Sequence, residues 1–307
     1  MYDLIIIGAG PAGLSAAIYA SRGGLKVALL EKEAPGGKVI KTAEIENWPG
    51  VKSIQGPDLA YEMFDHAQKF GAEYLYGNVV DIIDEGKIKK VVCEDKTTYE
   101  AYAVIIATGT KERKLGIKGE DKLYGRGLSY CAVCDGALYK NQPMAVIGGG
   151  NSALEEALYL TRFTTKLYLI HRRDQFRAEE IVVKHVKVNP AIKFKLKYVP
   201  VEILGDDKVT GIIIKNVETN ETETLEVSAV FPFIGLDPES HFASNLNITN
   251  ERGYILANEK METTVKGIFV AGDVLEKELR QIVTASSDGA IAANSAIAYI
   301  DELKRNL

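Results

Sequence analysis

The chain has 307 residues, of which 46% are hydrophobic and 26% charged, and its formal net charge is −5. This length fits about two globular domains, and the composition is that of an ordinary globular protein. A weakly acidic chain offers no electrostatic reason to bind nucleic acid or an anionic membrane. No apolar run approaches the roughly 20 residues that span a bilayer. With no visible export signal and only three cysteines, we expect a cytoplasmic protein without a structural disulfide framework.

The N-terminal segment has the pattern of a dinucleotide-binding unit. Residues 2–7 predict a buried strand, the turn Gly8-Ala-Gly10-Pro-Ala-Gly13 follows, and residues 14–22 look helical. Glycines in such a turn let the backbone approach a pyrophosphate, and the helix N-terminus favours negative charge. A second strand at 26–30 delivers Glu31, 23 residues after Gly8, where an acid holds a ribose hydroxyl. The predicted nucleotide-site residues are Gly8, Gly10, Pro11, Ala12, Gly13 and Glu31.

Further elements follow before the pattern repeats. Turn-rich segments at 36–38 and 46–50 read as loops, and residues 57–71 predict an amphipathic helix. Strands are expected around 79–83 and 88–93 and at 103–109, the last ending in Gly109.

A second copy of the strand, turn and helix begins 140 residues after the first. A strand at 144–148 leads into Gly148-Gly-Gly150-Asn-Ser-Ala153, a helix is expected at 154–163, and a strand at 166–170. Where the first copy has Glu31, this copy has His171-Arg172-Arg173 with Arg177 beyond. Arginines offer forked donors to a 2′-phosphate, so the second site suits NADPH and the first an unphosphorylated ribose such as that of FAD. A solvated basic face would show the same residues without binding a nucleotide.

The C-terminal part returns to the first unit. Strands at 192–217 and 225–231 extend the second unit, whereas a strand at 267–273 ends in Gly272-Asp273, which suits the sugar-alcohol chain of a cofactor. Arg280-Gln281-Ile282 and a small-residue helix from 284 to about 305 complete the chain.

The pair Cys131-Ala-Val-Cys134 is followed directly by Asp135-Gly136. Two cysteines three apart in a helical turn are close enough to form and break a disulfide. Zinc would need two further ligands, and none stands at close spacing. A thioredoxin-like fold would place the motif after an early strand, and an inert core pair would not carry these polar neighbours. The pattern therefore favours a redox-active dithiol, with Asp135 either moving a proton or supporting the helix end.

These motifs, with Glu46-Asn-Trp-Pro-Gly50, stand in an order that resembles the low-molecular-weight bacterial thioredoxin reductases. The resemblance implies an α/β fold with two Rossmann-like, three-layer ββα domains. An NADPH domain at 113–238 would be inserted into an FAD domain made of 1–112 and 239–307. It also implies a homodimer with one tightly bound FAD per subunit.

The same resemblance implies the electron route and the remaining site residues. NADPH would reduce FAD, FAD the Cys131–Cys134 disulfide, and the dithiol thioredoxin. Cys134 would face the flavin, Cys131 would attack thioredoxin, and Asp135 would be the general acid. The NADPH domain would rotate on hinges near 110–114 and 235–238. The implied FAD residues add Gly37, Lys38, Asn47, Gly109, Gly272, Asp273, Arg280, Gln281 and Ile282. The implied NADPH residues are Gly148, Gly150, Asn151, Ser152, Ala153, His171, Arg172, Arg173 and Arg177.

Three positions depart from the family pattern. Lys38 replaces a usual Gln, and its charge would favour reduced, anionic flavin if it lies near that cofactor. Ser287 replaces a common Gly. Ala137-Leu138 replace aromatics that help dock thioredoxin, which keeps open a reductase of another dithiol carrier. The sequence is also compatible with a flavoprotein that feeds a one-electron carrier, and with a non-catalytic redox sensor or zinc module.

Overall fold

The computed structural model describes residues 1–42 and 45–305, which fall into two compact units. Of the described residues, unit 1 comprises 1–42, 48–111 and 237–305, and unit 2 comprises 112–236 together with 45–47. The strands β7 (Thr110–Glu112) and β15 (Leu236–Pro238) span two of the boundaries between the units, and they pair with each other as a two-stranded sheet. None of the described helices is both long and apolar enough to cross a membrane.

Unit 1 is built on a seven-stranded sheet in the order β3-β2-β1-β6-β5-β4, with β16 also pairing with β6. Strands β1, β2, β3 and β16 run parallel to β6 or to its parallel neighbours, whereas β4 and β5 form an antiparallel hairpin. The long β6 pairs with β5 along its first half and with β16 along its second half. The strands are β1 (Tyr2–Ile7), β2 (Val27–Glu31), β3 (Glu73–Tyr76), β4 (Val79–Glu85), β5 (Ile88–Cys93), β6 (Thr98–Ile106) and β16 (Ile268–Val270).

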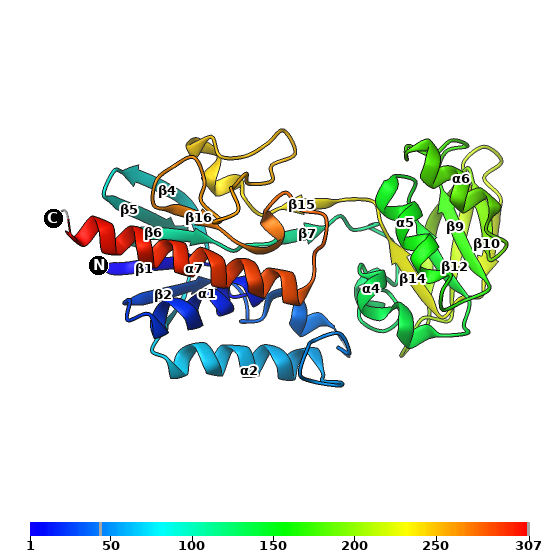
Figure 1. Cartoon of the computed structure of the whole chain (residues 1–307). Coiled ribbons are helices and arrows are strands. Elements are labelled where there is room, and N and C mark those ends of the chain that lie inside the picture. Colours follow the sequence, from blue (N-terminus) through cyan, green and yellow to red (C-terminus); the bar gives the residue numbers. More distant parts are fainter. Residues whose placement is uncertain (43–44, 306–307) are drawn as a thin grey trace. The chain divides into compact units, whose positions relative to one another are not determined.

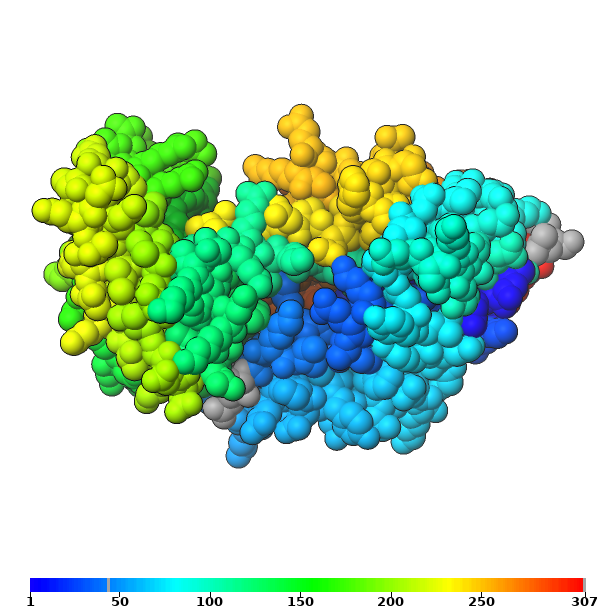
Figure 2. Space-filling view, turned by 180° about the vertical axis from the view of Figure 1, so that it is seen from behind, coloured from blue at the N-terminus to red at the C-terminus, as the bar shows by residue number. Residues whose placement is uncertain are grey.

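Alternating side chains of this sheet enter two separate cores, as the period of a strand requires. In β1, Leu4 and Ile6 pack with the helices, whereas Ile5 and Ile7 pack on the opposite face. Figure 1 shows the red α7 lying alongside the blue α1 on the helical face. Figure 2 shows the cyan β4–β5 hairpin and the yellow to orange segment after β15 on the surface of the same unit. The helices are α1 (Pro11–Arg22), α2 (Gly56–Lys69) and α7 (Ile282–Arg305), with 3₁₀ turns η1 (Gly37–Lys41), η3 (His241–Leu246) and η4 (Gly272–Val274).

Unit 2 has three layers. A parallel four-stranded sheet, β10-β9-β8-β14, carries helices on one face and the antiparallel sheet β11-β12-β13 on the other. The strands are β8 (Met144–Ile147), β9 (Leu167–His171), β10 (Ile192–Leu196), β11 (Tyr198–Leu204), β12 (Gly211–Asn216), β13 (Thr222–Leu225) and β14 (Ala229–Pro232). The helical elements are α3 (Glu120–Leu123), α4 (Ala132–Asp135), η2 (Gly136–Tyr139), α5 (Asn151–Leu160) and α6 (Glu180–Val188).

Candidate functional site

The two cysteines of the motif are joined in a disulfide, with a sulfur–sulfur distance of 2.14 Å. The motif is not one helical turn, although its spacing suggests one. Cys131 is extended and caps the four-residue α4, and its Sγ accepts from the backbone N–H of Cys134 at 3.1 Å. The hydroxyl of Ser129 accepts from the N–H of Cys131 at 3.1 Å. This frame holds the disulfide at the start of α4, whose orphan N–H groups favour a thiolate.

Asp135 closes α4 and is half-buried beside the disulfide segment. Burial raises the pKa of its carboxyl group, and an interaction with the Ser129 hydroxyl opposes that rise. Its Oδ1 atom is buried and has no hydrogen-bond partner among the described residues. A buried carboxyl group with a raised pKa and an unoccupied oxygen is suited to take up and release a proton.

Tyr130 and Glu120 anchor the segment that leads into the disulfide. Glu120, only 4% exposed, accepts from the backbone N–H groups of Leu115 and Gly116 and from the hydroxyl of Tyr130 at 2.5 Å. No sequence motif revealed this clamp, because an acid ten residues before a tyrosine has no pattern of its own. It fixes the residue immediately before Cys131.

The first glycine turn leaves room for a bound group beside Gly10. No described atom lies within 4 Å of the place where a Cβ at Gly10 would stand. At Gly8, by contrast, φ is +103° and a Cβ would lie 2.5 Å from the carbonyl oxygen of Ala107. Gly37 packs onto the turn, since its Cβ would lie 3.2 Å from Gly10 Cα. A pyrophosphate could therefore approach the backbone at Gly10, whereas Gly8 and Gly37 on either side of it are closely packed.

Glu31 lies at the end of β2 but already has backbone partners. Its Oε2 accepts from the N–H of Ala9 at 2.8 Å, and its Oε1 accepts from those of Lys32 and Glu33 at 2.8 and 2.9 Å. Oε2, which accepts only one of these bonds, keeps a further lone pair. The side chain therefore holds the turn and could still accept from a ribose hydroxyl.

Asp273 follows β16 at the same end of the sheet. Burial raises the pKa of its carboxyl group, and the charges of Lys38, Lys277 and Arg280 oppose that rise. Its Oδ1 and the Nε of Arg280 are buried without a hydrogen-bond partner among the described residues. Such orphaned polar atoms fit a hydroxyl-bearing ligand chain, and they make FAD compatible with this cradle.

The remaining FAD-site residues are distributed as follows. Gly109 has φ +69°, and no described atom lies within 4 Å of the position that a Cβ there would occupy. Gly272 lies against Ala12, Pro11 begins α1, and Gln281 and Ile282 stand at the start of α7. Asn47 is exposed, and its role in the FAD site stays a prediction.

The second glycine turn, between β8 and α5, has the same open position. No described atom lies within 4 Å of a Cβ built at Gly150. Gly149 lies against the ring of His171, with a Cβ position only 2.2 Å from Cε1. The backbone N–H of Arg177 donates to the carbonyl oxygen of Gly149 at 2.7 Å. The basic loop therefore folds back onto the turn.

His171 has a supporting position within this loop. Its ring is 8% exposed and stacks on Phe176 at a centroid distance of 5.5 Å. Burial is the main cause of its lowered pKa, and the neighbouring arginines add to that effect. Arg172 and Arg173 are exposed and lie beside it in the chain. Asn151 bonds Glu179 through both amide atoms, Ser152 is exposed, and Ala153 is buried.

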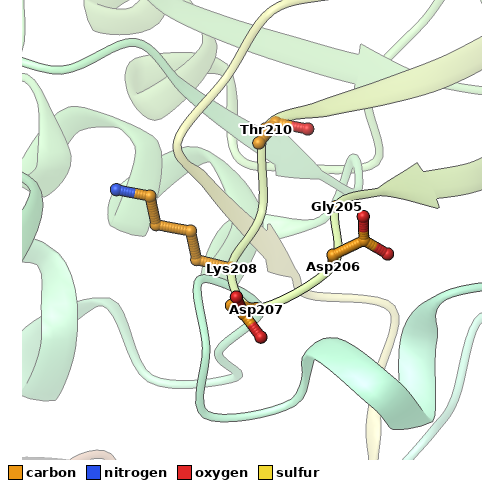
Figure 3. A pocket seen from close by; sticks show the side chains of 5 residues that line it. All are labelled: Gly205, Asp206, Asp207, Lys208 and Thr210. Atoms are coloured by element: carbon orange, nitrogen blue, oxygen red, sulfur yellow. The ribbon is translucent and has the colours of Figure 1, made fainter.

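A surface pocket of about 440 Å³ lies elsewhere in unit 2, in the loop between β11 and β12. It is lined by Gly205, Asp206, Asp207, Lys208 and Thr210. Figure 3 shows their side chains pointing in different directions, and Asp206 pairs with Lys122. No described residue of the dithiol motif or of the glycine turns lines this pocket.

Comparison with known proteins gives consistent matches over the whole chain. A family model described as pyridine nucleotide-disulphide oxidoreductase matches residues 2–289. The thioredoxin reductase of Bacillus subtilis (strain 168) is 49% identical over 308 aligned positions, covering 100% of this chain and 97% of that protein. That of Listeria monocytogenes is 48% identical, covering 100% and 96%. The crystal structure of the Streptococcus pyogenes thioredoxin reductase is 46% identical, covers 98% and 99% of the two chains, and has a TM-score of 0.95.

The likeness confirms the predicted fold class of two Rossmann-like α/β units, and it identifies the chain as an enzyme. The chain belongs to the pyridine nucleotide-disulphide oxidoreductase family and, within it, to the bacterial-type thioredoxin reductases.

Proposed function

We propose that this protein is an NADPH-dependent, FAD-containing reductase of thioredoxin. The observation that carries the proposal is the Cys131–Cys134 disulfide beside the buried Asp135 carboxyl group. It lies in a chain that matches a protein named thioredoxin reductase at 49% identity over its whole length. A cytoplasmic homodimer, as the resemblance implies, is part of the same proposal.

The two nucleotide turns would hold the cofactors. The cradle of unit 1, from Gly8 to Gly13 with Glu31 and Asp273, would hold FAD. The turn of unit 2, with Arg172, Arg173 and Arg177, would hold NADPH. Bound FAD would supply a two-electron relay from NADPH to the disulfide. The open positions at Gly10 and Gly150 support this assignment, because each lets a pyrophosphate approach the backbone.

The residues of unit 2 would carry out the disulfide chemistry. Reduction of the Cys131–Cys134 bond by an electron pair gives two thiolates, of which one must take up a proton. Asp135 would donate that proton to Cys134. The Cys131 thiolate would then attack the disulfide of thioredoxin, forming a mixed disulfide and releasing one thioredoxin thiolate, which takes a proton from water. Asp135 would recover its proton when the Cys134 thiol is deprotonated to attack the mixed disulfide, which re-forms the Cys131–Cys134 bond and releases the second thioredoxin thiolate. The backbone frame of Ser129 and α4 would keep Cys131 at the N-terminal edge of α4, where a thiolate is stabilised.

The segments 110–114 and 235–238 would serve as hinges between the half-reactions. Gly235 has φ +132°, a backbone conformation that residues with a side chain rarely adopt. Its carbonyl oxygen accepts from the backbone N–H of Arg113 at 3.1 Å. Few backbone bonds hold such short strands, which supports a hinge.

The test is anaerobic oxidation of NADPH by the purified protein with its own thioredoxin. Wild type and Cys93→Ala, which alters the free buried cysteine of β5, should turn over, and Cys134→Ser should not. Full turnover by Cys134→Ser would contradict the proposal. Flavin reduction without turnover on thioredoxin would indicate another dithiol carrier. The small, exposed Ala137 beside Leu138 keeps that second function open.

A further inference from the structure

Lys38 lies at the carboxyl ends of the parallel strands of unit 1. It follows Gly37, which packs onto Gly10 of the first glycine turn. Its Nζ donates to Oγ1 of Thr110 at 2.9 Å, and the side chain is half-buried. Thr110 follows the turn that ends β6. The carboxyl ends of parallel strands are where such sheets bind cofactors, so Lys38 places its ammonium group within the cradle.

Charged side chains of both signs surround the buried carboxyl group of Asp273 at this end of the sheet. Lys38, Lys277 and Arg280 act on the buried carboxyl group of Asp273, and Asp288 is the second acid. Lys277 is paired with Asp288, and the Arg280 guanidinium lies 4.9 Å from the ring centroid of Tyr254. Lys38 is thus one of several cations whose charge acts on this carboxyl group.

We propose that Lys38 sets the reduction potential of the flavin. The inference rests on the FAD site proposed above. A flavin that accepts two electrons and one proton becomes an anion, and a fixed cation in a partly buried site stabilises that form over the neutral oxidised ring. The bond to Thr110 holds the ammonium group at a fixed place.

The test is a redox titration of the FAD-loaded protein against a dye of known potential. In Lys38→Gln the equilibrium constant for two-electron reduction should fall at least tenfold, which corresponds to a potential about 30 mV lower. Lys38→Arg keeps the charge and should stay close to wild type. Lys41→Gln is the matched control, because it removes an exposed charge from the same η1 turn. The shift should persist at high salt, since a partly buried charge is poorly screened.

An unchanged potential in FAD-replete Lys38→Gln would overturn the inference. Loss of flavin from both Lys38→Gln and Lys38→Met would also overturn it, because Lys38 would then retain the cofactor rather than tune it. A wild-type protein that takes up no FAD would instead contradict the proposed function, so the two failures are distinguishable.

Discussion

The two glycine turns share the same strand, turn and helix arrangement. Their differences show which positions are constrained by packing and which by the ligand. At the third glycine position, a Cβ on Gly13 would lie 1.8 Å from the carbonyl oxygen of Gly8. The second turn is wide enough to hold Ala153. At the strand ends, Glu31 bonds backbone N–H groups of its turn, whereas the second turn is closed by the backbone of Arg177. Backbone closure thus leaves the arginine side chains available to a ligand.

Substitutions at the third glycine position of the two turns should have the largest effect on stability and cofactor binding. Gly13→Ala drives a methyl group into backbone, so we expect loss of most bound FAD and at least about 3 kcal/mol of stability. Ala153→Gly in the second turn should cost about 1 kcal/mol or less. Flavin absorbance per chain and denaturant midpoints measure both. Equal effects in the two variants would show that the turns are not constrained differently.

Removing the arginines should affect nucleotide choice next. With Arg172→Ala and Arg173→Ala combined, the ratio of kcat/KM for NADPH to that for NADH should fall about 100-fold, because charged hydrogen bonds contribute about 1.5–3 kcal/mol each. Arg162→Ala, which removes an exposed arginine stacked on Tyr159, is the control. An unchanged ratio would favour the solvated basic face over a 2′-phosphate site.

The helices that follow the two turns differ in a buried acid, and this should give the smallest effect. Helix α1 contains no acid, whereas in α5 burial, with a contribution from Glu155, raises the pKa of Glu156 to about 7. The folded state therefore binds more protons than the unfolded chain, and stability falls as pH rises from about 4.5 to about 7. Glu156→Gln should stabilise unit 2 by about 1–2 kcal/mol at pH 8, after allowance for solvent screening, and change little at pH 4.5. Melting temperatures of both proteins across this range provide the measurement, and a pH-independent difference would contradict the assignment.

The sequence predicted those elements whose pattern is local. The predicted bounds of β1 and β5 match the structure, since each has a short apolar run ended by turn residues. The pattern missed α6 (Glu180–Val188) and β3 (Glu73–Tyr76), which are short and bury few of their residues. It also began α7 two residues late.

The same limit applies to the candidate site. Gly-rich turns and the cysteine pair carry their chemistry in adjacent residues, so their positions could be predicted. The clamp of Glu120 on Tyr130 and the pairing of Lys277 with Asp288 depend on how the chain folds back, and a single sequence does not display such contacts.

The divided pairing of β6 has a consequence for synthesis on the ribosome. The second half of β6 has no pairing partner on one side until β16 is synthesised. The helical face of the sheet is not covered until α7, the last element of the chain, has been made. Unit 2, whose strands all lie between residues 144 and 232, emerges complete before either. The inserted unit can therefore fold during translation, while the N-terminal strands stay unfinished until the C-terminus leaves the exit tunnel. A chain truncated before residue 268 would retain the dithiol and six strands of the unit 1 sheet, but it would lack β16 and the covering helix α7.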